Sequence, residues 1–312
     1  MSIIIFPQAR REQIELILSE LHKLKPQSEN EKYAIEQNIL FFKSIRSTFS
    51  YLHWLYKTRR HIRRADLLEI NELLPDLDKV FHAKMAEIER RPRPGIIRPI
   101  VEYVTKLVAT SSQDKRYRIV SLGSGSMEVE RQVIEKLQKI GCVQSMTIVG
   151  FDISQNTRAF AAKNLSSLPH VRIVQETTLT KKRLSELERE TKESVLIVVS
   201  GNDIFTLLSD FSSDTFDFAM TALFLHHLHN AARSMLIENM RSVARRTLNY
   251  DGYQNEFVLL PLSITGWHSP VFLNAAIFSS IRFPNRFEVQ RLHTEVQIDF
   301  YSHGHYRAIF SS

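Results

Sequence analysis

The chain has 312 residues, a formal net charge of +7 and a single cysteine, Cys142. This length allows one large α/β domain with an accessory segment, or two domains. A single cysteine excludes an intrachain disulfide, and no segment approaches the ~20 apolar residues that a bilayer-spanning helix needs. The opening MSIIIFPQARR has only a short apolar run before charge follows, so we expect no signal peptide and a cytoplasmic protein.

The first hundred residues carry helical periodicity and almost no strand pattern. Residues 11–24 repeat apolar side chains at helical spacing as far as Pro26. The residues from 31 to 57 predict the buried face of one long helix, marked by Phe41, Ile45, Phe49, Leu52 and Tyr56. We therefore expect a helical region over residues 1–110, interrupted by a proline-rich turn at 90–99, and we expect it to cap a substrate site.

From residue 118 the pattern changes to alternating strands and helices. The expected strands are residues 118–122, 146–154, 195–205, 216–225 and 256–263. This alternation predicts crossover helices and a doubly wound, mostly parallel sheet in an α/β domain over residues 111–312. The strand-like segment 171–178 and the charged helix after it form an expected insertion at 171–193. The last residues, 287–312, indicate a β-hairpin that closes one sheet edge.

The segment RIVSLGSGSMEVE, residues 118–130, combines a strand, a turn with two glycines and a helix. Gly123 and Gly125 permit positive φ and a close approach of a ligand to the backbone. A dinucleotide fingerprint would place its third glycine at Glu128, a carboxylate near the helix end that a pyrophosphate would need. The pattern argues against NAD and FAD. A nucleoside without phosphates and a tight turn with no ligand both stay open.

Polar residues follow the next two strands of the expected sheet. Asp152 ends one strand, and an acid there can accept hydrogen bonds from both ribose hydroxyls, although exposed strand-end acids are common. Asn202 and Asp203 follow the other strand, where a polar side chain can meet an adenine amino group or cap the next helical turn. Together with the glycine turn, these strand ends favour an adenosine-containing ligand.

Residues 118–263 resemble a class I S-adenosylmethionine-dependent methyltransferase of the small-molecule branch. VSLGSGS is similar to the first glycine motif of that family, IVGFDIS to its ribose-binding strand end, and VVSGNDIFTLL to its adenine-side motif. The block that begins at Phe216 and contains LHHL at 225–228 is similar to its fourth strand and helix.

The resemblance implies a Rossmann-like methyltransferase fold that binds S-adenosylmethionine. The cofactor-binding residues that it implies are Gly123, Ser124, Gly125, Asp152, Ile153, Asn202, Asp203, Ile204 and Thr221. If the segment at 171–176 were the third strand of the motif, Glu176 would take the adenine-side role of Asp203.

Two adjacent histidines, His226 and His227, follow the strand toward which the methyl group should point. Methyl transfer requires alignment and, for a hydroxyl or protonated amine acceptor, a base whose pKa lies near the working pH. Histidine titrates in that range, so His227 and His226 are the candidate catalytic residues. The alternative is that one ring packs and the other bonds a backbone carbonyl. No acid or cysteine neighbours them at ligand spacing, so we expect no metal.

A small-molecule substrate is expected rather than a nucleic acid. Residues 263–284 are rich in apolar and aromatic side chains, which indicates either an acceptor pocket or plain core. The basic clusters at 57–64 and 90–98 lack the aromatic interleaving of RNA-binding modules and are typical of solvated faces. Two rivals stay open: a nucleic-acid methyltransferase, favoured by those clusters, and a scaffold protein, favoured by Ser121 and Met127, where the family often has an acid and a glycine.

Overall fold

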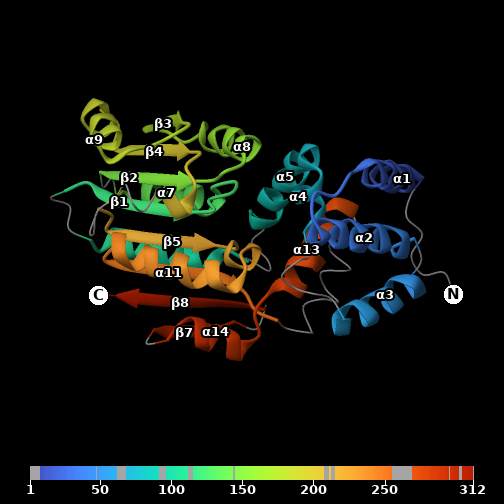
Figure 1. The fold of residues 1–312 in the computed structure, drawn as a ribbon. Helices are drawn as coiled ribbons and strands as arrows, with labels where there is room; N and C mark the ends of the chain where they lie inside the picture. The colour runs from blue at the N-terminus through green and yellow to red at the C-terminus, as the bar shows by residue number, and fades with distance from the viewer. Residues whose placement is uncertain are drawn as a thin grey trace. The chain divides into compact units, whose positions relative to one another are not determined.

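The structure is a computed structural model that divides into two compact units. It describes residues 8–311 except for 47, 62–67, 91–95, 112–114, 143–144, 207–210, 212–214, 255–268, 295 and 302–303. Met1–Phe81 and Tyr253–Asn285 form one unit, which we call the helical unit. His82–Gly252 and Arg286–Ser312 form the other, which we call the sheet unit (Figure 1).

The division differs from the boundary that the sequence predicts near residue 110. Helix α6, Arg98–Ala109, belongs to the sheet unit, where its Ile100 and Val104 share one hydrophobic cluster with Ile119 of the sheet. In the opposite sense, α13, Pro270–Arg282, follows the sheet in sequence but packs into the core of the helical unit. Buried apolar contacts, and not order along the chain, therefore set the two units. The expected role of the N-terminal helices as a cap stays a prediction.

The helical unit is built around an aromatic cluster. Its described helices are α1 (Gln8–Lys23), α2 (Glu29–Ser44), α3 (Thr48–His61), α4 (Ile70–Leu73), η2 (Pro75–Leu77) and α13. Helix α5 (Asp78–Glu89) begins in this unit, which ends at Phe81, and continues into the sheet unit. The ring of Phe278 lies edge-on to Phe41 at a centroid distance of 5.5 Å and stacks on Trp54 at 5.9 Å. These rings bury large apolar areas in one core.

The expectation of one long helix over residues 31–57 is wrong. Helix α2 ends at a cap on Ile45, and α3 begins as a separate helix. Because the chain turns there, α3 buries Tyr51. Leu52 and Tyr56, which continue the helical spacing of α2, are 50% and 60% exposed.

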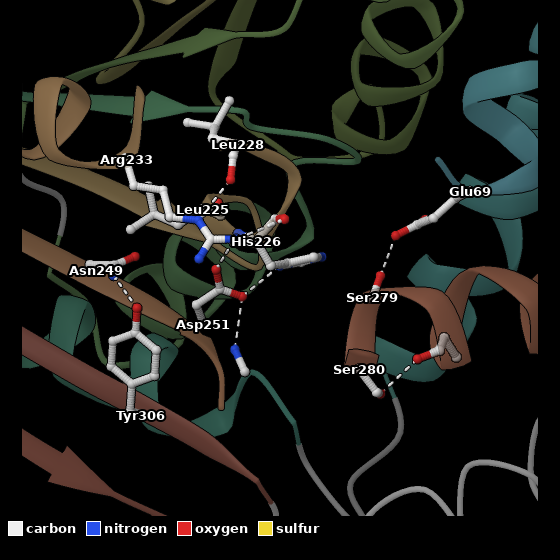
Figure 2. Close-up of polar contacts among 12 residues, drawn as sticks. Glu69, Leu225, His226, Leu228, Arg233, Asn249, Asp251, Ser279, Ser280 and Tyr306 are labelled. Atoms are coloured by element: carbon white, nitrogen blue, oxygen red, sulfur yellow. Dashed lines mark hydrogen bonds and ion pairs between the residues drawn. The ribbon is translucent and has the colours of Figure 1, made fainter. Parts of the chain in front are cut away.

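A buried polar network fixes α4 to its neighbours in the helical unit. The Ile70 backbone N–H donates to Asn274 Oδ1 at 2.9 Å, and Asn274 Nδ2 donates to Asn38 Oδ1 at 2.9 Å. The Ser279 hydroxyl donates to the Glu69 carboxylate (Figure 2). Buried amides with several partners specify one packing of these helices, because any other would leave polar groups without hydrogen bonds.

The sheet unit contains, in its described residues, one eight-stranded sheet in the order β3-β4-β2-β1-β5-β6-β8-β7 (Figure 1). The strands are β1 (Tyr117–Leu122), β2 (Met146–Phe151), β3 (Val171–Glu176), β4 (Val195–Ser200), β5 (Phe218–Ala222), β6 (Arg246–Gly252), β7 (Gln297–Phe300) and β8 (His305–Ser311). The pairs from β3 to β6 are parallel, and β8 is antiparallel to β6 and β7. The predicted doubly wound, mostly parallel α/β sheet is confirmed.

Helices cover both faces of this sheet. Successive strand residues alternate between two hydrophobic clusters, as Ile119 and Val120 do. Helices α6, α7 (Glu128–Lys139) and α8 (Gln155–Leu165) contribute to one cluster, and α9 (Lys181–Glu190) and α11 (Asn230–Val243) contribute to the other. Because both faces are covered, β2 and β4 are buried throughout and have nearly continuous apolar sequences. Among the described helices of both units, none is long and apolar enough to cross a membrane.

Several strand predictions need correction in detail. Strand β3 forms the sheet edge and β4 lies between β3 and β2, so 171–193 is an addition at the edge. Helix α11 ends at Val243, and β6, a strand that the sequence does not predict, begins at Arg246. The strand expected at 256–263 lies outside the described residues. The C-terminal hairpin is confirmed, but α14, Arg286–Leu292, is a helix that precedes it.

Candidate active site

The turn after β1 uses backbone conformations that favour glycine. Gly123 and Gly125 adopt φ values of +62° and +52°. A Cβ added to Gly125 would meet no described atom within 4 Å, so the turn opens onto free space on that side. A Cβ on Gly123 would instead lie 2.7 Å from Cδ1 of the Phe224 ring and closer still to its Cγ and Cδ2. The two glycines therefore serve different purposes.

Asp152 is joined to the glycine turn by hydrogen bonds. The Gly125 N–H donates to Asp152 Oδ2 at 3.1 Å, and the Ser154 N–H donates to Oδ1 at 2.9 Å. The carboxylate is half-buried. The structure thus brings the predicted glycine motif and the predicted strand-end acid together. The next residue, Ile153, is 79% exposed beside them.

Glu128 occupies the start of α7 as a buried, neutralised carboxylate. Arg90 Nε donates to its Oε2 at 3.0 Å, and Gln132 Nε2 donates to its Oε1 at 3.1 Å. Arg131 and Asn164 complete the ring of donors, at 3.3 and 3.1 Å. A phosphate at this helix end would meet a carboxylate that already takes up the local donors. The geometry agrees with the sequence argument against a dinucleotide.

A second acid, Glu130, lies beneath the turn. Burial raises the pKa of its carboxyl to about 7, against the opposing effect of a hydrogen bond from the Ser121 side chain. Ser121 stands where the resembling family often has an acid on the strand. In this chain the Ser121 side chain is instead hydrogen-bonded to the buried carboxyl group of Glu130 on α7.

The side chains that follow β4 are largely used within the protein. Asn202 Oδ1 accepts from the Leu179 N–H at 2.7 Å and from the Ser200 hydroxyl at 2.6 Å, and its Nδ2 donates to the Leu179 carbonyl. Its amide therefore holds the loop after β3 against the end of β4. Asp203 is exposed, and its Oδ1 caps the next turn through the Phe205 N–H at 2.9 Å. The apolar Ile204 is buried in the core beside them.

Arg158 of α8 lies across the ends of β2 and β4. Its Nη1 donates to the carbonyls of Asp152 and Ile153, both at 2.8 Å. A Cβ on Gly201 would lie 2.8 Å from its Cζ, so the guanidinium rests on the glycine backbone. A planar cation thus borders the position where the sequence predicts an adenine ring.

At the ends of β5 and β6 the structure forms a histidine–aspartate pair. His226 Nδ1 lies 2.7 Å from Asp251 Oδ1, and the His226 backbone N–H donates to Oδ2 at 2.9 Å (Figure 2). Asp251 is fully buried and also accepts from the Gly252 N–H at 2.8 Å. Burial raises the pKa of this carboxyl, but the charge of and hydrogen bond from His226 outweigh burial and hold the pKa below its usual value.

Arg233 of α11 holds the loop that carries the histidine. Its Nε donates to the carbonyls of Leu225 and Leu228 at 2.9 and 2.7 Å, and its Nη2 donates to the His226 carbonyl at 3.2 Å (Figure 2). The charge of this guanidinium also lowers the pKa of Asp251. The backbone of His226 is therefore fixed from two sides, which restricts where its ring can point.

His227 is half-buried next to this pair. Its ring centroid lies 4.1 Å from that of His226 and 6.2 Å from that of Phe224. The short 3-10 helix η3, Leu225–His227, places the two histidines in succession after β5. The structure thus brings both predicted histidines to the same end of the sheet as the glycine turn, and His226 pairs there with the Asp251 carboxylate.

The chain is similar to known proteins in its fold but not in its sequence. No protein-family model matches the chain, and no curated protein matches its sequence. Among solved structures, the CurJ carbon methyltransferase has a TM-score of 0.50 at 11% identity, over 96% of this chain and 70% of that one. The chain has a Rossmann-like methyltransferase fold.

Two further similar structures are methyltransferases of different kinds. The plantazolicin methyltransferase BpumL, in complex with SAH, has a TM-score of 0.48 at 11% identity, over 83% of this chain and 98% of that one. The small RNA methyltransferase HEN1 has a TM-score of 0.47 at 16% identity, over 70% of this chain. The match spans 26% of HEN1.

Two hydroxyl groups at the carboxyl ends of the strands bear on whether S-adenosylmethionine fits there. Ser124 in the glycine turn is half-buried and Thr221 in β5 is buried, and the hydroxyl oxygens of both are shielded from solvent without a hydrogen-bond partner among the described residues. A buried hydroxyl without a partner is costly, and such groups gather where a ligand or water completes the hydrogen bonding. With open space at Gly125 and a carboxylate, Asp152, at the same turn, the residues present fit a nucleoside cofactor.

The sequence did not identify three residues at this end of the sheet: Asp251, Arg158 and Phe224. Asp251 lies in β6, a strand that carries the buried polar residues Thr247, Asn249 and Asp251 in place of an apolar run. Arg158 sits in an ordinary helical pattern, and only its two carbonyl contacts reveal it. Phe224 follows an apolar strand and looks like its continuation. For Asp251, an acid followed by glycine after an alternating segment was the available signal.

Proposed function

We propose that this protein transfers a methyl group from S-adenosylmethionine to a small-molecule acceptor. One observation carries the proposal: the Gly125–Asp152 hydrogen bond and the His226–Asp251 pair lie at the carboxyl ends of the neighbouring parallel strands β2, β1, β5 and β6. The carboxyl edge of a doubly wound sheet is where such folds bind ligands. A nucleoside-binding turn and a buried base at one edge are what a methyl transfer with proton removal requires.

The cofactor would be held by residues along β1, β2 and β4. Asp152 would accept hydrogen bonds from the ribose hydroxyls, while Ser124 and Thr221 would donate or accept through hydroxyls that have no other described partner. Asp203, Ile204 and the exposed Ile153 would flank the adenine, and Asn202 would shape that loop through the Leu179 backbone. When bound, S-adenosylmethionine supplies an electrophilic methyl group on a positively charged sulfur.

His226 would act as the general base. Asp251 accepts the Nδ1 proton, which fixes the tautomer and leaves Nε2 as the nitrogen that can take a proton from the acceptor. As Nε2 gains that proton, the buried Asp251 carboxylate stabilises the imidazolium. Arg233 keeps the ring in place by holding the carbonyls around it. His227 would contact the acceptor or donor as a neighbour and not as the paired base.

A nucleic-acid acceptor is the second candidate, because the chain carries a net charge of +7 and two arginine-rich segments. Binding through phosphates would weaken steeply with salt. The small-molecule class is favoured by the buried setting of the Asp251 pair, since a single enclosed base suits a compact acceptor that can enter a pocket.

The test is a calorimetric titration of the protein with S-adenosylmethionine and S-adenosylhomocysteine. Asp152→Asn is the test variant and Asp299→Asn the matched control, because Asp299 is an acid of the C-terminal hairpin that pairs with Arg307. We expect micromolar binding by the wild type and by Asp299→Asn, and at least tenfold weaker binding by Asp152→Asn.

The outcomes separate the candidate functions. If the folded wild-type protein binds neither S-adenosylmethionine nor S-adenosylhomocysteine at millimolar concentration, the scaffold hypothesis replaces the proposal. Binding of S-adenosylhomocysteine together with tight, salt-sensitive binding of single-stranded RNA would transfer the proposal to a nucleic-acid acceptor.

A further inference from the structure

The ring of Phe224 lies directly on the first glycine of the turn. A Cβ at Gly123 would overlap three carbons of the ring, with the most distant of them, Cδ1, at 2.7 Å. Glycine is therefore required at 123 for the ring as well as for its φ of +62°. The ring is half-buried, and thus one part of it stays open on the side away from the core.

The backbone before the ring is held in an uncommon conformation. Leu223 adopts a φ of +54°, in the left-handed region that costs a branched residue roughly 1 kcal/mol or more. Its N–H donates to the Tyr250 carbonyl of β6 at 2.7 Å, and the Phe224 carbonyl accepts from the His227 N–H at 2.9 Å. The chain sustains this strain, and the result is a ring directed from β5 onto the turn of β1.

The ring spans the two halves of the candidate site. On one side it touches the glycine turn, and on the other its centroid lies 6.2 Å from that of His227 with an interplanar angle of 34°. If Asp152 holds the ribose of the donor and the histidines receive its methyl group, the ring of Phe224 would be among the residues that border the sulfur. The face of an aromatic ring attracts a cation by about 0.5–2 kcal/mol.

We propose that Phe224 forms the part of the cofactor site that recognises the sulfonium charge, so that the protein prefers the charged methyl donor to the neutral demethylated product. The inference rests on the proposed function and names a specificity-determining residue of the same site. The attraction exists only while the sulfur is positively charged. The ring therefore binds the donor and releases the product, which keeps the site from being blocked after each transfer.

The experiment measures the ratio of the dissociation constants of S-adenosylhomocysteine and S-adenosylmethionine by calorimetry at fixed pH and salt. Phe224→Leu removes the aromatic face but keeps an apolar side chain, and Phe224→Tyr keeps the face. We expect the ratio to fall about 2- to 30-fold in Phe224→Leu and to stay within about twofold in Phe224→Tyr. Trifluorophenylalanine at position 224 keeps the ring shape while weakening its negative face, and it should lower the ratio as leucine does, even if the leucine variant folds poorly.

Each outcome decides one point. Equal weakening of both ligands in Phe224→Leu, with the fluorinated ring unchanged from wild type, would reduce Phe224 to a packing residue and overturn the inference while the proposed function stands. A folded wild-type protein that binds neither ligand would overturn the proposed function, and the inference with it.

Discussion

Asp251 binds His226 at two atoms: its Oδ1 lies 2.7 Å from Nδ1 of the ring, and its Oδ2 accepts from the backbone N–H at 2.9 Å. One carboxylate therefore fixes both the position and the tautomer of the histidine. Since Asp251 is fully buried and its pKa is held below the usual value, it stays charged at neutral pH. Burying this carboxylate charge costs desolvation energy. A histidine that served only to pack would not need a charged partner.

Asp251→Asn is predicted to separate catalysis from cofactor binding. An asparagine can offer its N–H to Nδ1 and favour the wrong tautomer, so we expect methyl transfer to fall by about 10²- to 10⁴-fold while cofactor affinity changes less than threefold. Nitrogen NMR of the histidine ring should show the proton on Nδ1 in the wild type and its loss from Nδ1 in the variant.

The control for this substitution is Asp299→Asn, which breaks the partly exposed pair between Asp299 and Arg307 in the C-terminal hairpin. Exposed pairs contribute little, so activity and tautomer should both match the wild type. A histidine that keeps its proton on Nδ1 and full activity without the Asp251 charge would remove the pair from the mechanism.

Glu130 should make folding stability fall as pH rises. Its folded pKa of about 7 lies above the unfolded value near 4.5, so the folded state holds the proton more tightly. Its stabilising effect is complete below pH 4.5 and is lost between about pH 4.5 and 7, by on the order of 3 kcal/mol. In Glu130→Gln this loss disappears, and the variant should be more stable than wild type at pH 8 by urea unfolding.

The titration of His293 must be separated from that of Glu130 in that experiment. Burial lowers the pKa of His293 to about 4, which gives stability a rise with pH between about 4 and 6.5, opposite in sign. This contribution cancels in the difference between wild type and Glu130→Gln. Glu135→Gln, on the same helix but partly exposed and paired with Arg131, is the matched control and should show a flat difference. A flat difference for Glu130→Gln as well would contradict the raised pKa.

Gly123→Ala is predicted to destabilise the protein by about 2–5 kcal/mol. The left-handed φ costs roughly 1–2 kcal/mol for alanine, and overlap with the Phe224 ring adds about 1–3 kcal/mol. Phe224→Ala removes the overlap, so the double variant should recover that second part, which a double-mutant cycle in urea measures as coupling. Gly125→Ala is the control: it has the same φ problem and no neighbour, so Phe224→Ala should not rescue it. Additive effects at 123 and 224 would mean that the ring moves aside freely.

The sequence predicts most of the sheet but little of its chemistry. Strands β1, β2 and β4 are apolar runs followed by glycine or acid, and their pattern suffices to predict these strands and the residues at their ends. Strand β6 could not be found in this way, because its buried face carries polar residues that bond one another across the sheet: Asn249 Nδ2 donates to Tyr306 Oη at 2.8 Å. Hydrophobic periodicity detects strands that bury apolar side chains. It does not detect a strand that buries hydrogen-bonded polar groups, and Asp251 was missed because it lies in such a strand.

The same limit explains why Asn202 and Asp203 could not be told apart from sequence. Both are polar residues after an apolar strand. Only the structure shows that Asn202 is committed to Leu179 while Asp203 stays exposed with a local cap. The division into units was equally inaccessible, because α13 reaches the core of the helical unit by packing across a long separation in sequence.

Asp203→Asn should weaken cofactor binding by about tenfold with little effect on stability. Asparagine caps a helical turn as well as aspartate does, so the fold keeps its Phe205 contact, while a hydrogen bond from the ligand to a charged group is lost. Glu176→Gln distinguishes the alternative in which β3 supplies the adenine-side acid. Weaker S-adenosylhomocysteine binding in Glu176→Gln with unchanged binding in Asp203→Asn would exchange the two roles.

Phe278→Ala is predicted to destabilise the helical unit by about 3–5 kcal/mol, because the ring is fully buried between Phe41 and Trp54. Since these contacts lie within one unit, amide hydrogen exchange should speed up in α2, α3 and α13 and stay slow in β1, β2 and β4. S-adenosylhomocysteine affinity, a property of the sheet unit, should change less than twofold. Phe287→Ala removes a ring that is 73% exposed and should alter stability by no more than about 0.5 kcal/mol. Exchange that accelerates equally in both units would mean that the chain unfolds as one cooperative body, and the division at Phe81 and Tyr253 would then have no energetic meaning.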